Sequence, residues 1–507
     1  MTTIPAASRA ALTTDPTATD VPVLPAPEVG DAGLRFPAAF VWGAATAAFQ
    51  IEGAAREDGR TASIWDTFCR VPGAVAGADT GDVACDHYHR WREDLDLMAE
   101  LNLGAYRFST AWPRICPEPG TVNRKGLDFY SRLVDGLLEK GIAPWLTLYH
   151  WDLPQALEDR GGWANRDVAQ WFAEYALTVH GALGDRVRHW TTLNEPWCSA
   201  LLGYAGGQHA PGRQEPQAAV SAVHHLLLAH GTAVRALRAA DPSAQLGITL
   251  NMTVADPADP DDPADRAAAD RLDALQNRLF AEPVLLGRYP QVAIDAHAAV
   301  GVALPVRDGD LEVISAPLDF LGLNYYTGAS VTAHPPAGVE VMPGGADVAR
   351  PTSEPNVGLG QVHSVSRGLP RTAMEWEVQP DGLRRLLERV QADWTGPADI
   401  PLYVTENGAA YDDEVAPDGS VPDADRVAYL VRHLEAVHAA RRNGVDVRGY
   451  FAWSLLDNFE WAYGYDKRFG IVRVDFDTLE RTPKASARAY AEVARTGRLA
   501  PGGTVWP

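Results

Sequence analysis

The sequence predicts an α/β fold, a single (β/α)8 or TIM barrel with long loops on the C-terminal face of its strands. From about residue 35 onward, short apolar or β-branched runs alternate with longer amphipathic segments. Eight parallel strands joined by right-handed helical crossovers close a barrel, and eight such runs occur here. One domain can account for 507 residues, because barrels with insertions exceed ~400 residues.

The strands are expected where large apolar and β-branched residues cluster in short runs between turn-forming residues. In chain order these runs are 40–45, 105–108, 144–148, 187–193, 245–250, 319–323, 401–405 and 447–453. Because these runs alternate with helical segments, the pattern favours parallel pairing of the strands through right-handed crossovers.

Four segments between these runs carry apolar residues at helical spacing, so each is predicted to be an amphipathic helix. The first carries Trp91, Leu95, Met98 and Leu101, and the second carries Leu127, Tyr130, Leu133, Val134, Leu137 and Leu138. The third carries Val168, Trp171, Phe172, Tyr175 and Val179, and the fourth carries Val427, Leu430, Val431 and Leu434. Gly141, Gly184 and Gly444 follow the last three as stop signals.

Two stretches interrupt the alternation, the Asp/Pro-rich 256–265 and the Gly/Pro-rich 335–370. They follow the fifth and sixth strands, so they are predicted to be long loops on the C-terminal face, where barrels keep their active sites. Residues 1–34 are rich in Ala, Pro and Thr and lack the basic and apolar regions of a signal peptide. We expect a disordered arm at 1–34 and a catalytic barrel at 35–500.

Charge and composition limit the partners of the protein. The formal net charge of −22 argues against nucleic acid and anionic membranes, because both would repel an acidic chain. A neutral small molecule is the expected ligand. The sequence has no run of 18 apolar residues, and its four cysteines, Cys69, Cys85, Cys116 and Cys198, show no C-x-x-C spacing. These features favour a reducing compartment, the cytoplasm.

Polar and aromatic side chains follow the predicted strands at the point where each strand ends. Packing alone does not require such residues there, although each has a structural explanation when taken singly. The set is Gln50, Glu52, His150, Trp151, Asn194, Glu195, Asn324, Tyr326, Glu406, Trp453, Glu460 and Trp461, with Arg107 inside the second strand. Carboxylates, amides and tryptophan faces together suit a carbohydrate, which presents hydroxyl edges and CH faces.

Glu195 and Glu406 lie far apart in the sequence, and each follows a β-branched run. A barrel would bring them to one mouth, and two carboxylates across a glycosidic bond are the usual apparatus of glycoside hydrolysis. One must be protonated to assist the leaving oxygen, and the other must be ionised to attack the anomeric carbon. Arg107 and Tyr326 are expected to hold Glu406 ionised, and Asn194 is placed to bind the sugar 2-hydroxyl.

These residues belong to an ordered series of motifs from about Phe36 to about Tyr490. The series is Phe36-Pro37, 40–46, 50–53, 86–89, 106–109, 150–154, 193–196, 322–326, 404–408, 453–455 and 457–461. The chain resembles the family 1 glycoside hydrolases, the β-glucosidase family, over essentially the whole folded part. The resemblance implies a retaining, exo-acting β-glycosidase without metal or cofactor, acting on β-glycosides and short β-linked oligosaccharides.

Carried over by position, Glu195 matches the acid/base and Glu406 the nucleophile of the family. Positions that bind the terminal sugar match Gln50, His150, Trp151, Asn194, Trp453, Glu460 and Trp461, and Asn324 and Tyr326 match residues that orient the carboxylates. Trp197 and Cys198 fall on the leaving-group side. Glu195 in place of Gln implies O-glycosides, and the intact Glu460-Trp461 pair implies sugars without a 6-phosphate. An ionised Glu460 is expected to accept from the 4- and 6-hydroxyls.

Two alternatives remain open at this point, a transglycosylase that uses the same covalent intermediate and a catalytically inactive sugar-binding protein. The choice among β-glucose, β-galactose and β-fucose also remains open. Metal ligation by Asp86, His87, His89, His224 and His225 is not expected, because the resemblance implies no metal and adjacent residues of a helix face apart.

Overall fold

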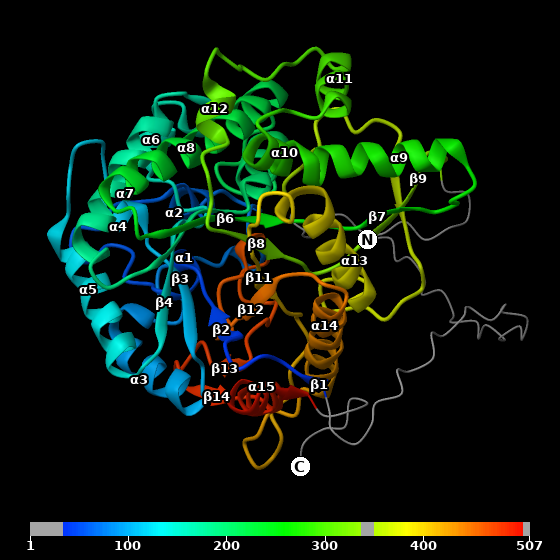
Figure 1. Cartoon of the computed structure of the whole chain (residues 1–507). Helices are drawn as coiled ribbons and strands as arrows, with labels where there is room; N and C mark the ends of the chain where they lie inside the picture. The colour runs from blue at the N-terminus through cyan, green and yellow to red at the C-terminus, as the bar shows by residue number, and fades with distance from the viewer. Residues whose placement is uncertain (1–33, 336–348, 500–507) are drawn as a thin grey trace, which may run out of the picture.

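The computed structural model describes residues 34–335 and 349–499, and a closed barrel of eight parallel strands forms their centre (Figure 1). The strands are β2 (Val41–Ala45), β3 (Ala105–Ser109), β4 (Ala143–Tyr149), β5 (His189–Asn194), β6 (Gln245–Asn251), β8 (Phe320–Asn324), β11 (Leu402–Asn407) and β12 (Val447–Trp453). They follow one another around the barrel in this order, and β12 pairs with β2 to close it. All eight predicted strands are confirmed, with small differences at their ends.

The inside of the barrel is filled by large aromatic side chains, and the ring from β4 meets rings from β8, β11 and β12, none of which pairs with β4. The Trp145 ring of β4 lies 5.4 Å from Phe320 of β8, 4.7 Å from Tyr403 of β11 and 5.2 Å from Phe451 of β12. Gly43 makes room for this layer, because a Cβ there would lie 2.5 Å from the Phe451 ring. The barrel is therefore a packed core, and only its ends are free to build a site.

Helices form the outer layer around the strands (Figure 1). The longer ones are α3 (His87–Glu100), α5 (Arg124–Glu139), α7 (Val168–Leu183), α8 (Pro216–Ala240), α13 (Pro380–Val390), α14 (Ala424–Arg442) and α15 (Ala485–Thr496). The four predicted amphipathic helices correspond to α3, α5, α7 and α14, and their apolar faces pack against the barrel. Gly141 has a φ of 71°, a left-handed conformation that suits glycine just past the end of α5.

Shorter helices lie in the connections between these elements. They are α1 (Ala48–Ile51), α2 (Ile64–Phe68), α4 (Trp112–Ile115), α6 (Gln155–Glu158), α9 (Pro263–Asp273), α10 (Leu279–Leu286), α11 (Gln291–Ala299) and α12 (Asp310–Ile314). The 3₁₀ and π segments are η1 (Ala76–Ala78), η2 (Gly162–Ala164), η3 (Cys198–Gly206), η4 (Ala274–Arg278), η5 (Gln391–Thr395) and η6 (Trp461–Tyr463). Two of these, α1 and η3, directly follow barrel strands and carry residues of the predicted site.

The two predicted long loops contain regular structure, which corrects the sequence interpretation. β7 (Ala255–Pro257), β9 (Ala329–Thr332) and β10 (His363–Val365) form a small sheet in the order β10-β9-β7. Asp256 of β7 pairs with Arg367 and Arg385, so long-range ion pairs hold this sheet in place. The spacing of apolar residues could not reveal strands this short. Residues 336–348 of the second stretch lie outside the described residues.

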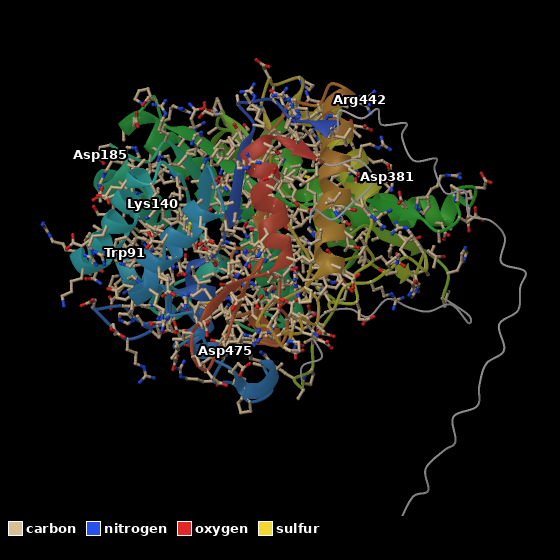
Figure 2. The ribbon with its side chains drawn as sticks, turned by 90° about the horizontal axis from the view of Figure 1, so that it is seen from below. Trp91, Lys140, Asp185, Asp381, Arg442 and Asp475 are labelled. Carbon is tan, nitrogen blue, oxygen red and sulfur yellow. The ribbon has the colours of Figure 1, made fainter. Side chains whose placement is uncertain are left out.

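The remaining strands pair near the two ends of the described chain. β1 (Leu34–Arg35) pairs with β15 (Arg498–Leu499), and β13 (Val472–Val474) pairs with β14 (Arg481–Pro483). The arm expected at 1–34 lies outside the described residues except for Leu34, which is part of β1. Exposed charged side chains such as Asp185, Asp381 and Arg442 lie at the outline of the molecule (Figure 2). Within residues 34–335 and 349–499, no helix has the length and apolar character needed to cross a bilayer.

Candidate active site

The predicted site residues come together at the C-terminal ends of the barrel strands. Asn194, Asn324 and Trp453 are the last residues of β5, β8 and β12, and Glu406 lies next to the end of β11. The others follow in the connections, except Arg107, which lies inside β3. Hydrogen bonds, ion pairs and ring contacts join Arg107, His150, Trp151, Asn194, Glu195, Cys198, Asn324, Tyr326, Glu406, Trp453 and Trp461 into one network, and Gln50 contacts Glu460, the residue before Trp461.

The two carboxyl groups are buried and have different partners. Glu406 forms an ion pair with Arg107, whose NH1 lies 2.5 Å from Oε1, and it accepts a hydrogen bond from the Tyr326 hydroxyl at 2.6 Å. Glu195 accepts hydrogen bonds from the Asn324 amide at 2.6 Å and from the Cys198 thiol at 3.2 Å. Only Glu406 therefore has a cationic partner in direct contact.

These partners separate the two carboxyl groups in proton affinity. Burial raises the pKa of Glu195 to about 8, and the nearby charge of Glu406 adds to the increase. Burial also raises the pKa of Glu406, but Arg107 and Tyr326 oppose this because both stabilise the ionised form. Near neutral pH the proton therefore resides on Glu195, and the negative charge resides on Glu406.

The hydrogen bonds of Asn194 fix the tautomer of His150. Asn194 Oδ1 accepts from Arg107 at 2.6 Å and from Asn324 at 3.1 Å, so its amide nitrogen faces His150 Nε2 at 3.0 Å. Burial and the charge of Arg107 hold the pKa of His150 well below its usual range, so the ring is neutral. Nε2 then accepts, and Nδ1 carries the proton. Within the described residues this buried N–H has no partner, so it can donate to a ligand hydroxyl.

Gln50 offers the complementary group. Its Nε2 donates to Asn458 Oδ1 and to the Phe459 carbonyl, both at 2.9 Å, and lies 3.4 Å from Glu460 Oε2. Because these contacts use the amide nitrogen, Oε1 is left as a buried acceptor without a partner among the described residues. A buried donor on His150 and a buried acceptor on Gln50, both past the C-terminal ends of barrel strands, suit a polyhydroxylated ligand.

Tryptophan and histidine rings line the same region. The Trp453 ring stacks on His150 at 5.7 Å with 17° between the planes, and the Trp461 ring lies 4.5 Å from Trp151. The Phe49 ring also stacks with Trp461, at 6.0 Å with 10° between the planes. These contacts hold the tryptophan faces in fixed orientations, as recognition of a sugar CH face requires.

Glu460 differs from its expected state. Burial and the charges of Glu406 and Glu195 raise the pKa of Glu460 to about 8, and the weak contact with Gln50 only partly opposes this. With this pKa the carboxyl of Glu460 is protonated at neutral pH, whereas the sequence interpretation expects it to be ionised. A protonated carboxyl can donate one hydrogen bond and accept others, so it can still bind two hydroxyl groups.

The raised pKa of Glu460 predicts a pH-dependent stability difference. The unfolded chain releases this proton near its ordinary pKa of 4.5 and the folded chain near 8, so the folded state loses stability as pH rises between these values. Glu460→Gln cannot ionise, so its stability relative to the native protein should grow by about 3–4 kcal/mol from pH 5 to pH 8. Urea unfolding at the two pH values measures this change. An equal difference in the free energy of unfolding between Glu460→Gln and the native protein at both pH values would contradict the prediction. Glu414→Gln, at an exposed position, is the control.

A buried ion cluster supports the loop that carries Glu460. Asp457 accepts from the Lys484 ammonium at 2.7 Å, from the Gly470 backbone at 3.0 Å and from Arg468 at 2.8 Å. Both Asp457 and Lys484 are fully buried. Because Asp457 lies three residues before Glu460, these contacts fix the start of the loop that carries Glu460 from outside the site.

Three site residues have left-handed backbone conformations that side chains rarely adopt. The φ angles are 76° at Trp151, 46° at Glu195 and 51° at Trp461. Each such residue costs of order 1–3 kcal/mol and persists only where surrounding contacts impose it. This placement of strain at a proposed acid and two aromatic walls is typical of a functional site.

Two residues of the predicted set stand apart from the central network. Glu52 pairs with Arg114 Nε at 2.9 Å and accepts from Tyr130 at 2.6 Å, so it is a structural ion pair behind the strand ends. Trp197 is half-buried and donates from Nε1 to Asn356 Oδ1 at 3.0 Å, which ties it to the segment that precedes β10.

The histidines considered as metal ligands contact other protein groups. These contacts are between 2.5 and 3.0 Å, and they occupy at least one ring nitrogen of each histidine. Their partners are Asp94 for His87, Asp86 for His89, Asp310 and Tyr289 for His224, and the Trp163 carbonyl for His225. The contact of His87 lies within α3 and that of His89 lies at the start of α3, whereas His224 and His225 join α8 to α12 and to η2.

Another group, Asp262, Asp265 and His334, has ligand atoms within 4.8 Å of one another. Asp265 accepts from the Thr332 hydroxyl and the Ala333 backbone, and His334 lies 2.7 Å from Asp262. These contacts connect the start of α9 to the end of β9, which is a structural role.

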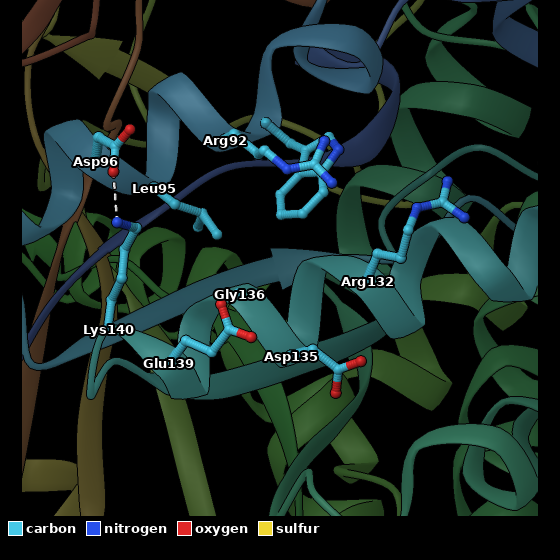
Figure 3. A pocket seen from close by; sticks show the side chains of 9 residues that line it. Arg92, Leu95, Asp96, Arg132, Asp135, Gly136, Glu139 and Lys140 are labelled. Atoms are coloured by element: carbon cyan, nitrogen blue, oxygen red, sulfur yellow. Dashed lines mark hydrogen bonds and ion pairs between the residues drawn. The ribbon is translucent and has the colours of Figure 1, made fainter.

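A groove of about 380 Å³ lies between α3 and α5 on the outside of the barrel (Figure 3). Gly136 lets the helices approach, because a Cβ there would lie 2.7 Å from Leu95 and 2.8 Å from Trp91. Lys140 pairs with Asp96 across the groove, and Figure 2 places Trp91 and Lys140 at the edge of the molecule. With no buried carboxyl among its lining residues, the groove is not a second candidate for catalysis.

Comparison with known proteins identifies the family. The model of glycosyl hydrolase family 1 matches residues 33–498. The chain belongs to glycosyl hydrolase family 1.

Relatives in family 1 cover nearly the whole chain. It is 51% identical to the thermostable beta-glucosidase B of Thermobispora bispora over 92% of each protein. It is 48% identical to a bifunctional beta-D-glucosidase/beta-D-fucosidase of Bifidobacterium breve, over 90% of this chain and 97% of that one. The crystal structure of a psychrophilic beta-glucosidase from Micrococcus antarcticus matches with a TM-score of 0.88 at 56% identity, covering 92% of this chain and 98% of that chain. The resemblance drawn from the motifs is confirmed.

Sequence reasoning missed several residues of this family 1 site. Asn458 and Lys484 hold the loop that carries Glu460, and Asn251 contacts Cys198, but none of them stands out by spacing. Asn458 lies inside a quoted motif, which was the one available signal. His209 was also missed, although its ring lies 5.2 Å from both Trp65 and Trp151.

Proposed function

We propose that the chain is a retaining, exo-acting β-glucosidase in which Glu406 is the nucleophile and Glu195 the acid/base. Family membership and the named relatives give the enzyme class, a retaining O-glycoside hydrolase. The observation that supports the two roles is the contrast between the buried carboxyls. Glu406 contacts a guanidinium cation and accepts a hydrogen bond from a hydroxyl group. Glu195 accepts hydrogen bonds only from an amide and a thiol.

The proposed first step forms a covalent glycosyl-enzyme. The ionised Glu406 oxygen attacks the anomeric carbon, the bond from that carbon to the glycosidic oxygen breaks, and Glu195 gives its proton to the departing oxygen. Arg107 and Tyr326 keep Glu406 ionised until the bond forms. In the second step Glu195, now ionised, takes a proton from water, whose oxygen attacks the same carbon and releases Glu406.

The substrate we propose is a small β-glycoside or a short β-linked oligosaccharide with a terminal β-D-glucosyl residue. The N–H of His150 and the free oxygen of Gln50 provide a donor and an acceptor for its hydroxyls, and Glu460 provides both. Trp453 and Trp461 provide the aromatic faces. β-Fucosides are a second glycone to examine, because the Bifidobacterium breve relative is named for both activities. Cellulose degradation is the pathway class this specificity fits.

We place the enzyme in the cytoplasm under the same proposal. All four cysteines are buried free thiols, and burial raises the pKa of Cys116 to about 11 and of Cys69 to about 12. Such thiols need no oxidising compartment, and fractionation of cells that express the full chain tests this placement.

Direct observation of the released sugar tests the proposed reaction. Proton NMR of an aryl β-glucoside during the first minutes of turnover should show β-glucose before the α anomer appears by mutarotation. Initial α-glucose would contradict a retaining mechanism, and absence of turnover would favour a sugar-binding protein. Product analysis with added alcohol or cellobiose separates the transglycosylase alternative, which would give mainly glycosylated acceptor instead of free glucose.

A further inference from the structure

The carboxyl group of Glu195 accepts one hydrogen bond on each oxygen. Asn324 donates to Oε1 at 2.6 Å, and the Cys198 thiol donates to Oε2 at 3.2 Å. Behind the thiol, the Asn251 amide nitrogen at the end of β6 lies 3.7 Å from the sulfur. Asn251, Cys198 and Glu195 therefore form a short chain of donors that ends on the proposed acid/base.

The local backbone places the thiol on this carboxyl. Glu195 directly follows β5 with a left-handed φ of 46°, and Pro196 begins the helical turn that leads into η3. The Cys198 backbone N–H donates to the Glu195 carbonyl at 3.0 Å, so the side chain three residues later lies back over Glu195. The contact is thus built by the same turn that orients Glu195.

A thiol at this place acts as a weak donor and does not ionise. Burial and the charge of Glu195 raise the pKa of Cys198 well above its usual range, so the proton stays on sulfur. Asn251 can only donate from its amide nitrogen, so the sulfur lone pairs face Asn251 and the S–H faces Glu195. Weak donation suits a carboxyl that must be protonated in one step and ionised in the next.

We propose that Cys198, held by Asn251, is a positioning residue that fixes the Oε2 edge of Glu195 and keeps the ionised form only weakly stabilised. This proposal rests on the proposed acid/base role of Glu195. A hydroxyl at the same place would be a stronger donor and would favour the ionised carboxylate too much for the first step. A side chain without a donor would leave the acid form favoured to higher pH.

The proposal predicts shifts of opposite sign in the basic limb of the pH profile of kcat/KM. Cys198→Ser should move that limb to lower pH and Cys198→Ala to higher pH, each by roughly half to one unit, because a donor favours the ionised form. Asn251→Ala should shift it in the same direction as Cys198→Ala but less. The substrate is an aryl β-glucoside with a poor leaving group, which needs a proton in the first step.

Two further variants separate this proposal from the acid/base assignment. Cys116→Ala removes a buried thiol outside the site and should leave the profile unchanged. Glu195→Gln should remove the basic limb altogether. Opposite shifts in the Ser and Ala variants, with unfolding free energies close to that of Cys116→Ala, support the proposal.

Identical profiles for the native protein and both Cys198 variants overturn it, while the loss of the basic limb in Glu195→Gln leaves the acid/base role standing. Shifts of the same sign in both Cys198 variants also overturn it, because they would reflect changed packing. A basic limb that persists in Glu195→Gln overturns the acid/base assignment and this proposal together.

Discussion

Glu406→Ala is expected to lower kcat on an aryl β-glucoside by on the order of 10⁴-fold or more, because no other group can form the covalent intermediate. The change also leaves Arg107 buried without its ion-pair partner, so some stability should be lost. Steady-state kinetics at the pH optimum measure the activity, and urea unfolding shows whether the fold persists.

Two control variants accompany Glu406→Ala: one changes an exposed glutamate that follows β11, and the other replaces Glu406 by a side chain of the same size. Glu414→Ala, at an exposed position eight residues later, should retain native activity. Glu406→Gln keeps the shape of the side chain, so its loss of activity cannot be attributed to a cavity. Added azide should restore turnover of Glu406→Ala with formation of α-glucosyl azide, since azide would attack from the vacated face. Activity of Glu406→Gln within tenfold of native would contradict the assignment.

Glu195→Ala is expected to affect substrates according to their leaving groups. A glucoside with a poor leaving group, such as cellobiose, should lose about 10²–10⁴-fold in kcat/KM, because the departing oxygen no longer receives a proton. An activated dinitrophenyl glucoside needs no such proton in the first step, so its kcat/KM should change far less. A series of aryl glucosides of graded leaving-group pKa measures this difference.

Azide provides the matched control for Glu195→Ala. It should accelerate the second step and yield β-glucosyl azide, the configuration opposite to that expected from Glu406→Ala. Equal losses on poor and activated substrates would argue against Glu195 as the acid. If the losses were equal and Glu195→Ala also formed α-glucosyl azide, the assigned roles of Glu195 and Glu406 would have to be exchanged.

The barrel could be predicted from the sequence because its strands are short apolar runs and its helices carry apolar residues at a clear helical spacing. Runs such as 245–250 and 447–453 are apolar and bounded by turn residues, and the stripe on α5 ends at Gly141. The sheet of β7, β9 and β10 could not, because three- and four-residue strands carry no period. Its stability comes from ion pairs such as Asp256 with Arg385, which join distant parts of the chain.

The sequence could indicate which residues gather at the ends of the barrel strands, but not their protonation states. Position after a strand and a match to family motifs indicated Glu195, Glu406 and Glu460, and the structure brings all three into one buried region. The raised pKa of Glu460 depends on mutual repulsion and burial, which exist only after folding. The contact between Cys198 and Glu195 likewise depends on the geometry of a turn, which the sequence does not reveal.

Covalent trapping of the enzyme by a 2-deoxy-2-fluoro-β-glucoside with a good leaving group tests the central claim most directly. The fluorine slows both steps, and the activated leaving group keeps the first one fast enough for the intermediate to accumulate. Peptide mass spectrometry of the trapped enzyme should find one fluoroglucosyl group on Glu406, in the peptide that contains Thr405 and Asn407. A label on Glu195, on Glu460 or on any other residue would contradict the account.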